Sequence, residues 1–177
     1  GTSPDRSAKI TLMEDNVLIA PAPYSAPAAY YIPSVGRMSA VEILKGSSQI
    51  QYGPFTTGGT INFVSAPIPS KFSAGFLTDY GSFNTSRTIA NVGIANETFG
   101  AVVQFLNYNS DGFKELPNGA NTGFDKNDVM AKFKIQSKRT SKIYNALEFK
   151  MVYADEDANE TYLGLTEEDF KTSPFKR

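Results

Sequence analysis

Residues 41–65 constrain the fold of this 177-residue chain more than any other stretch of its sequence. They read as a strand, a polar helical turn that opens at Gly46, a bend at Tyr52-Gly53-Pro54, and a second strand after Gly58-Gly59. Proline cannot continue a helix, and glycine adopts backbone angles that other residues avoid. The pattern therefore predicts two strands joined by a compact turn. The first strand, residues 39–45, is expected to be buried on both faces because its apolar side chains are nearly continuous.

Two shorter features precede this stretch. Residues 9–19 predict two short strands joined at Asp15-Asn16, since Asp and Asn tolerate the positive φ of a tight turn. Residues 20–33 contain four prolines and three tyrosines. Proline forbids a regular strand ladder and holds the chain extended, so this segment is expected to be a stiff, exposed loop. A simple proline-rich linker is the alternative interpretation.

Beyond residue 70, apolar and polar residues alternate with a period of two. In residues 143–153, one face carries Leu147, Phe149, Met151 and Tyr153, and the other carries Ala146, Glu148 and Lys150. Residues 128–137 repeat the pattern, and residues 87–95 repeat it more weakly. A period of two over about 9–11 residues matches a tilted strand that crosses a bilayer. Pro67-Ile68-Pro69 interrupts the chain before these strands, and a domain boundary is expected there.

The connections between the expected strands differ in length. The strands are expected near residues 71–80, 87–95, 99–109, 128–137 and 142–154. The joins are then residues 81–86, 96–98, 110–127 and 139–141, and residues 155–177 form a last long segment. Alternation of short and long connections is typical of an outer-membrane barrel, with tight periplasmic turns and long external loops. A soluble β-sandwich can show the same alternation.

The composition excludes several functional classes. The formal net charge is -1, which argues against a general nucleic-acid binder. Cysteine and histidine are absent, which argues against zinc, iron–sulfur and haem ligation and against Ser–His–Asp catalysis. The acidic residues between positions 155 and 169 lack the spacing of a calcium loop, so we expect them in a solvated outer loop. No catalytic residue and no resident metal or cofactor is expected.

Three motifs resemble one known family. Glu42-Ile43-Leu44-Lys45-Gly46, then Tyr52-Gly53, then residues 58–64 resemble the end of the plug domain of TonB-dependent outer-membrane receptors. Residues 18–24 and 164–170 resemble, more narrowly, the ferric dicitrate transporter branch of that family. The resemblance implies that residues 1–66 are the C-terminal part of a plug, a mixed α/β remnant. Residues 67–177 would be the first antiparallel strands of a transmembrane β-barrel in the bacterial outer membrane, and the barrel would be incomplete because the chain would be a fragment of a longer receptor.

The resemblance also implies a function and a set of site residues. Such a receptor binds a ferric siderophore or a ferric citrate-like chelate, its plug rearranges, and iron enters only as part of the chelate. The expected partners are the chelate, outer-membrane lipid, and a TonB-type energy-coupling protein that binds a segment absent from this chain. Ligand contacts are expected from Pro21, Ala22, Pro23, Tyr24, Ser25, Tyr52, Pro54, Phe55, Thr56 and Thr57. Hinge or turn roles are expected for Gly46, Gly53, Gly58 and Gly59, although these glycines can equally serve only to permit tight turns.

Two positions depart from the pattern of the family branch. Lys45 stands where arginine is usual, which keeps the charge but loses the planar fork. Phe55 stands where the dicitrate branch has a polar residue, which favours an aromatic or mixed siderophore over citrate. A second class of function stays open, a secreted β-rich carbohydrate-binding or adhesion module whose tyrosines stack on sugar rings. Detergent dependence separates the two, since an open sheet of barrel strands would self-associate through its exposed edges.

Overall fold

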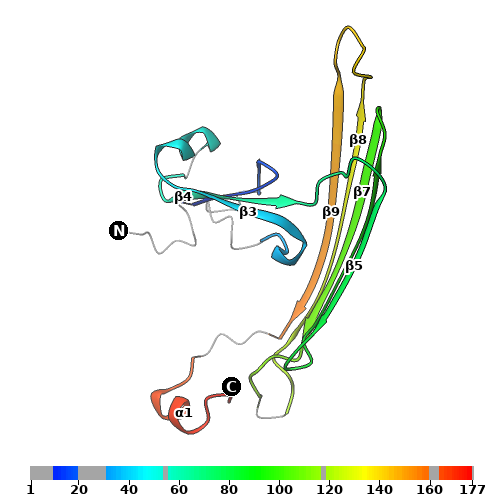
Figure 1. The fold of residues 1–177 in the computed structure, drawn as a ribbon. Helices are drawn as coiled ribbons and strands as arrows, with labels where there is room; N and C mark the ends of the chain where they lie inside the picture. Colours follow the sequence, from blue (N-terminus) through cyan, green and yellow to red (C-terminus); the bar gives the residue numbers. More distant parts are fainter. Residues whose placement is uncertain (1–9, 20–30, 54–55, 117–118, 160–163, 177) are drawn as a thin grey trace. The chain divides into compact units, whose positions relative to one another are not determined.

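A computed structural model describes residues 10–19, 31–53, 56–116, 119–159 and 164–176 of the chain (Figure 1). The chain divides into two compact units, residues 1–67 and residues 68–177. Each unit contains one β-sheet, and each is described by itself below.

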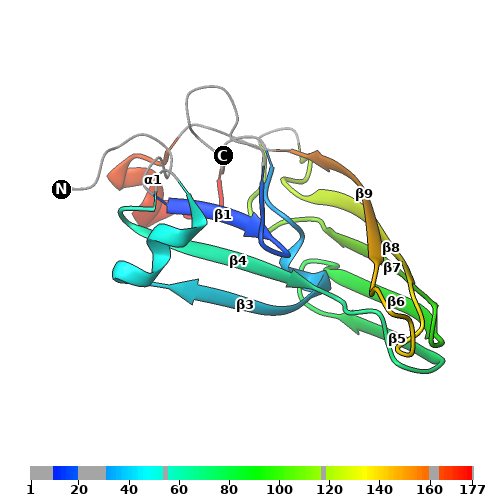
Figure 2. The ribbon, with the colours of Figure 1, turned by 90° about the horizontal axis from the view of Figure 1, so that it is seen from above.

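The first unit contains a four-stranded mixed sheet in the order β2-β1-β4-β3 (Figure 2). The strands are β1 (Ile10–Glu14), β2 (Val17–Leu18), β3 (Met38–Leu44) and β4 (Gly59–Ser65). β1 pairs in parallel with β4, whereas the other two pairs are antiparallel. Leu12, Ile19 and Phe63 form its buried core, and Ile10, Met38 and Ile61 pack against them.

The turn between β1 and β2 confirms the prediction at Asp15-Asn16. Both residues have positive φ, 50° at Asp15 and 65° at Asn16. Short polar side chains tolerate this region because they can form local hydrogen bonds. The Asp15 amide donates to the Phe63 carbonyl at 2.9 Å, which joins the turn to β4.

The segment from β3 to β4 contains the expected strand, helical turn and strand, but the predicted burial of the first strand is wrong. Two 3-10 turns flank β3: η3 (Val35–Arg37) precedes it, and η4 (Ser47–Tyr52) follows it. Val41 is 44% exposed and Ile43 is 62% exposed. β3 is the edge strand of a four-stranded sheet, so its apolar side chains have a neighbour on one side only. Continuous apolar sequence therefore marks a strand here without implying burial on both faces.

The second unit contains a five-stranded antiparallel sheet in sequence order, which does not close on itself. The strands are β5 (Ser73–Tyr80), β6 (Ser86–Ala95), β7 (Phe99–Ser110), β8 (Phe124–Gln136) and β9 (Ala146–Ala158). β7 and β8 pair over twelve residues without a register break, from Phe99 with Ile135 to Ser110 with Phe124. Figure 1 shows this sheet as a long, curved wall of strands.

Three strand boundaries in this sheet differ from the prediction by four residues. The first is the start of β8, which lies at Phe124 instead of residue 128. The join between β8 and β9 spans residues 137–145 instead of residues 139–141, because Gln136 pairs with Ala146 and leaves the intervening residues outside the ladder. β9 continues to Ala158, so Asp155, Glu156 and Asp157 lie in a strand and not in the expected outer loop. These carboxylates project from β9 within reach of water, since each of the three is exposed.

A short helix, α1 (Glu167–Thr172), lies in the segment after β9. The Thr166 hydroxyl accepts a hydrogen bond from the Asp169 amide at 3.1 Å and so caps the start of the helix. The same hydroxyl donates to the Asp169 carboxylate at 2.8 Å. This bond, assisted by nearby Lys176, holds the pKa of Asp169 below its ordinary value.

Candidate functional site

The glycine-bounded turn between β3 and β4 is the first candidate site. Gly53 ends η4 with φ 97° and ψ -161°, a conformation that is closed to residues with a side chain. A Cβ at Gly53 would meet no atom within 4 Å, so the backbone angle and not crowding requires glycine. Gly46 begins the same turn with φ 89°. Thr56 then bonds back to the Gly53 carbonyl at 3.2 Å.

The structure brings part of the predicted ligand set together at this turn. Tyr52 is half-buried, Thr56 is buried, and Thr57 is exposed. The Gly59 amide donates to the Thr56 carbonyl at 3.0 Å, which places Gly58 within a tight turn and Gly59 at the start of β4. The predicted contacts Pro21, Ala22, Pro23, Tyr24, Ser25, Pro54 and Phe55 lie outside the described residues. The ligand-binding and hinge roles stay predictions.

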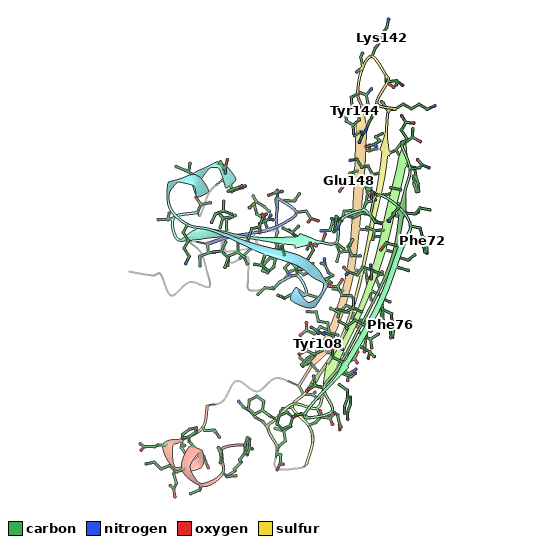
Figure 3. All side chains as sticks on the ribbon, in the orientation of Figure 1. Phe72, Phe76, Tyr108, Lys142, Tyr144 and Glu148 are labelled. Atoms are coloured by element: carbon green, nitrogen blue, oxygen red, sulfur yellow. The ribbon has the colours of Figure 1, made fainter. Side chains whose placement is uncertain are left out.

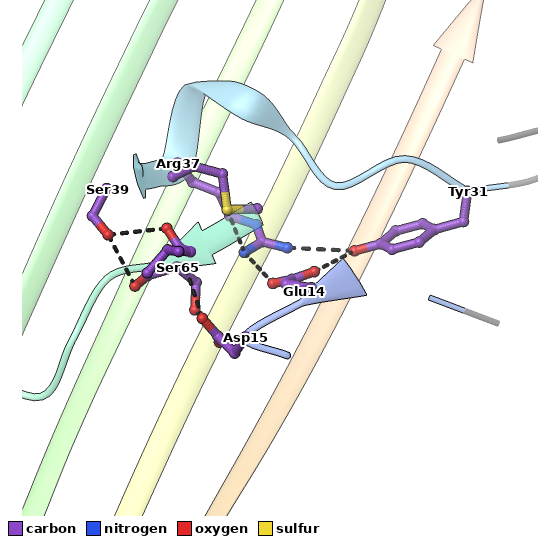
Figure 4. Close-up of polar contacts among 8 residues, drawn as sticks. Glu14, Asp15, Tyr31, Arg37, Ser39 and Ser65 are labelled. Atoms are coloured by element: carbon purple, nitrogen blue, oxygen red, sulfur yellow. Dashed lines mark hydrogen bonds and ion pairs between the residues drawn. The ribbon is translucent and has the colours of Figure 1, made fainter. Parts of the chain in front are cut away.

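A buried ion pair that the sequence analysis missed lies in the first unit (Figure 4). Nη1 of Arg37 lies 2.7 Å from Oε1 of Glu14, and the two side chains are 0% and 9% exposed. The Tyr31 hydroxyl lies 3.4 Å from both Nη2 of Arg37 and Oε2 of Glu14. Burying two charges is costly unless they are paired and hydrogen-bonded, and this cluster meets that requirement while it links β1 to the segment that leads into β3.

Further polar contacts fix the end of β4. The Asp15 carboxylate accepts hydrogen bonds from the Ser65 amide at 2.9 Å and from the Ser65 hydroxyl at 2.6 Å. Asn62, which is 1% exposed, accepts from the Asn16 amide at 2.9 Å and donates to the Glu42 carboxylate at 2.8 Å. β4 is thereby bonded through side chains to both of its neighbours in the sheet.

The second unit presents one apolar face and one face of mixed character. One face carries the apolar residues of the alternation: Ala74, Phe76, Ala90, Val92, Ile94, Ala101, Val103, Phe105, Val129, Ala131, Phe133, Ile135, Leu147, Phe149, Met151 and Tyr153. In β6, β8 and β9 these positions confirm the predicted alternation. Figure 3 shows Phe72 and Phe76 on the convex side of the sheet, and Tyr108 and Glu148 on the opposite side.

The convex apolar face is exposed, whereas the concave face holds buried polar groups. Phe76 is 73% exposed and Phe149 is 57% exposed, but Asp128 is 0% and Lys132 is 6% exposed. The concave face also buries Val102, Leu106 and Met130, so it is mixed in character. A sheet in water does not usually expose a whole apolar face, and the convex face does. An exposed apolar face is typical of a strand wall with lipid on one side and a polar interior on the other.

The convex apolar face has a sharp polar boundary. In one cross-strand row Phe76, Ala90, Phe105, Val129 and Tyr153 are paired in order. In the next row towards the β7–β8 loop, the paired residues are all polar: Thr78, Thr88, Asn107, Asn127 and Asp155. The Asn107 amide donates to the Asn127 side chain at 3.0 Å. Four apolar rows, from Leu147 to Tyr153 in β9, span about 20 Å along the strand.

Among the described residues, no group of three or more acidic, histidine or cysteine side chains could hold a metal ion. In the same parts of the chain, no helix has the length and apolarity needed to span a membrane.

Comparison with known proteins supplies the context for these two units. No protein-family model matches the sequence. The structure is similar to the ferric citrate transporter FecA in its unliganded form, with a TM-score of 0.74 and 23% identity, over 99% of this chain and 26% of that one. It is also similar to the ferric yersiniabactin uptake receptor FyuA from Yersinia pestis, with a TM-score of 0.63 and 18% identity, over 82% of this chain and 23% of that one. The copper transporter OprC matches with a TM-score of 0.62 and 16% identity, over 85% of this chain and 23% of that one.

The chain thus spans about a quarter of the length of the solved structures that it matches. Those proteins are transporters and an uptake receptor. At these identities the likeness concerns the fold, a mixed sheet followed by an open five-stranded antiparallel sheet. The fold of this chain is that of one portion of a TonB-dependent outer-membrane receptor.

Proposed function

We propose that this chain is part of an outer-membrane receptor that captures a ferric chelate and imports it with energy from a TonB-type protein. In this proposal residues 1–66 belong to the plug and residues 67–177 form the first strands of the barrel wall. The chelate contacts the turn around Tyr52, Thr56 and Thr57, and the glycines that bound this turn allow the plug to rearrange.

The observation that carries the proposal is the exposed apolar face of the second sheet. A strand wall that exposes Phe76 and Phe149 along one face is unfavourable in water, and contact of that face with lipid stabilises it. The polar row from Thr78 to Asp155 then lies where the hydrocarbon ends. A carbohydrate-binding module that works in water has no use for this exposed apolar face.

The ligand class rests on the similar structures. FecA is a transporter of ferric citrate and FyuA a receptor for ferric yersiniabactin, so a ferric chelate is the ligand that we propose here. OprC is a copper transporter, which makes a copper ligand the first competitor in any test. Phe55, in place of a polar residue, supports a chelate with an aromatic part over citrate.

The test is growth of iron-starved Gram-negative cells that lack their own ferric-chelate receptors and express the complete protein to which this chain belongs. We expect growth on at least one ferric chelate, and loss of that growth when the energy-coupling protein is deleted. The matched control is the same strain with the protein absent. If the protein reaches the outer membrane but no ferric chelate supports growth, the proposed function is wrong, and copper uptake is then to be measured.

A further inference from the structure

The concave face of the second unit carries a row of charged and aromatic side chains with one residue from each strand. In order across the sheet the row contains Asp79, Arg87, Tyr108, Lys126 and Glu156. These residues lie in five different strands, which four connections separate in the sequence. The register of the strands places them in one row. A cation therefore stands on each side of one tyrosine.

Each cation in this row is paired with the acid at the outer edge. Nε and Nη2 of Arg87 both donate to the same oxygen, Oδ2 of Asp79. Nζ of Lys126 lies 2.6 Å from Oε2 of Glu156. Two of the donor groups of Arg87 therefore bind one oxygen atom. Its Nη1 group has no hydrogen-bond partner among the described residues and can donate to a ligand. The side chain of Arg87 is 38% exposed, so this group is accessible.

Tyr108 is held in place by a neighbouring ring. Its ring packs edge-on against Phe124, with 4.9 Å between centroids and 79° between planes. Aromatic pairs prefer this edge-to-face arrangement, which favours one orientation of the ring. Its hydroxyl has no hydrogen-bond partner in the described part of the chain, and the residue is 36% exposed. The row thus presents the packed ring and the accessible hydroxyl of Tyr108 beside the guanidinium of Arg87.

A cavity of about 230 Å³ opens at this point of the sheet. It is lined by Asp79, Tyr80, Gly81, Thr85, Arg87 and Tyr108. Complete sites for small molecules occupy about 300–1,000 Å³, so this cavity accommodates one ring of a larger ligand.

We propose that this cavity binds an aromatic ring bearing a carboxylate or phenolate oxygen, as one part of a larger chelate. The planar guanidinium of Arg87 matches a carboxylate and also stacks on aromatic faces, the Tyr108 hydroxyl donates to an anionic oxygen, and its ring packs against the ligand ring. The proposal rests on the proposed function, since a chelate reaches the concave face only if that face lines the interior of a receptor.

Asp79 determines how strongly the cavity binds an anion. Its carboxylate already accepts hydrogen bonds from part of the Arg87 guanidinium and repels a second anion nearby. Removing the acid and removing the arginine must therefore change anion affinity in opposite directions. A row of ion pairs that only stabilises the sheet would show no such reversal.

The test measures salicylate binding to the full chain in detergent micelles, by ligand-observed saturation-transfer NMR titration. We expect salicylate to bind at least tenfold more tightly than acetate or phenol, because each of these carries only one of the two recognised groups. Arg87→Gln is expected to weaken salicylate binding about tenfold, and Asp79→Asn to strengthen it severalfold. Lys142→Gln, which removes a positive charge from the β8–β9 loop, is the matched control and is expected to change nothing.

Folding of each variant is checked by far-ultraviolet circular dichroism in the same micelles, and an exposed ion pair contributes little to stability. If Arg87→Gln fails to fold, Tyr108→Phe replaces it and is expected to weaken binding threefold or more, since it deletes only the free hydroxyl. Equal affinity in Arg87→Gln and Lys142→Gln, or weaker binding in Asp79→Asn, would overturn the inference. If cells grow on a ferric chelate but either of those binding results is found, this inference is wrong and the proposed function is kept. If salicylate binds as expected but no ferric chelate supports growth, the proposed function is wrong and the binding site is kept.

Discussion

Neutralising Glu14 in the buried pair with Arg37 is the most demanding test of how the first unit is held together. Glu14→Gln keeps the size of the side chain and one hydrogen-bond acceptor, but it leaves the arginine charge without its carboxylate at 2.7 Å. Breaking a buried ion pair by removing one partner costs about 3–5 kcal/mol. We expect the low end, about 3 kcal/mol, because the glutamine oxygen and the Tyr31 hydroxyl can still accept from the guanidinium.

Hydrogen exchange read by mass spectrometry measures this loss locally in the chain. A loss of about 3 kcal/mol corresponds to roughly hundredfold faster exchange of the amides in β1 and β4. Glu42→Gln is the matched control, since Glu42 lies on the exposed edge strand and a glutamine there can still accept from Asn62. Adding Arg37→Met to Glu14→Gln is expected to restore part of the protection, because the buried arginine charge is then removed together with its carboxylate. Equal amide exchange rates of β1 and β4 in Glu14→Gln and Glu42→Gln would show that the pair of Glu14 and Arg37 does not stabilise the first unit.

Three further predictions concern other parts of the molecule. Phe149→Arg places a charge on the convex apolar face and is expected to cost about 2–4 kcal/mol of stability in phospholipid vesicles, measured by urea titration. Glu148→Gln, on the concave face, is the control and is expected to cost little. Asn62→Leu removes three partly buried hydrogen bonds and is expected to cost about 2 kcal/mol by the same titration. Asn145→Leu, at an exposed position, is expected to cost almost nothing. The pKa of Asp169 is lowered in the folded chain, so its contribution to the stability of α1 is complete above the ordinary carboxyl pKa and is lost as the pH falls through the lowered pKa. A carboxyl-detected NMR titration should show loss of the helix in that acidic range. A helix that persists below the lowered pKa would contradict this role of Asp169.

The sequence predicted those features whose cause is local. Asp15-Asn16 can adopt positive φ without help from distant residues, so the turn was recognisable from two residues. Gly53 ends η4 for an equally local reason. The alternation in β8 and β9 follows from strand geometry and was correctly assigned to two faces. In each of these cases the determining interaction lies within a few residues.

The features that the sequence did not predict depend on pairing between distant strands. The parallel pairing of β1 with β4 joins segments about fifty residues apart, and it decides that β3 and not β1 forms the outer edge of the first sheet. Glu14 and Arg37 meet only because of that arrangement. The row that contains Arg87 and Tyr108 likewise depends on the register of four strand pairs, which a shift of one residue would abolish. A search for oppositely charged residues at matching distances from the strand ends could have found it.

The polarity of the second sheet in a lipid bilayer is the most direct test of the account. The chain contains no cysteine, so single cysteines can be introduced one at a time along β8 and labelled with a fluorophore. After reconstitution of the full chain into vesicles that contain brominated phospholipid, we expect strong quenching at the odd-numbered positions from Val129 to Ile135. The even-numbered positions from Met130 to Lys134 should be quenched little. Uniform quenching, or the opposite alternation, would contradict the assignment of these strands to a membrane wall.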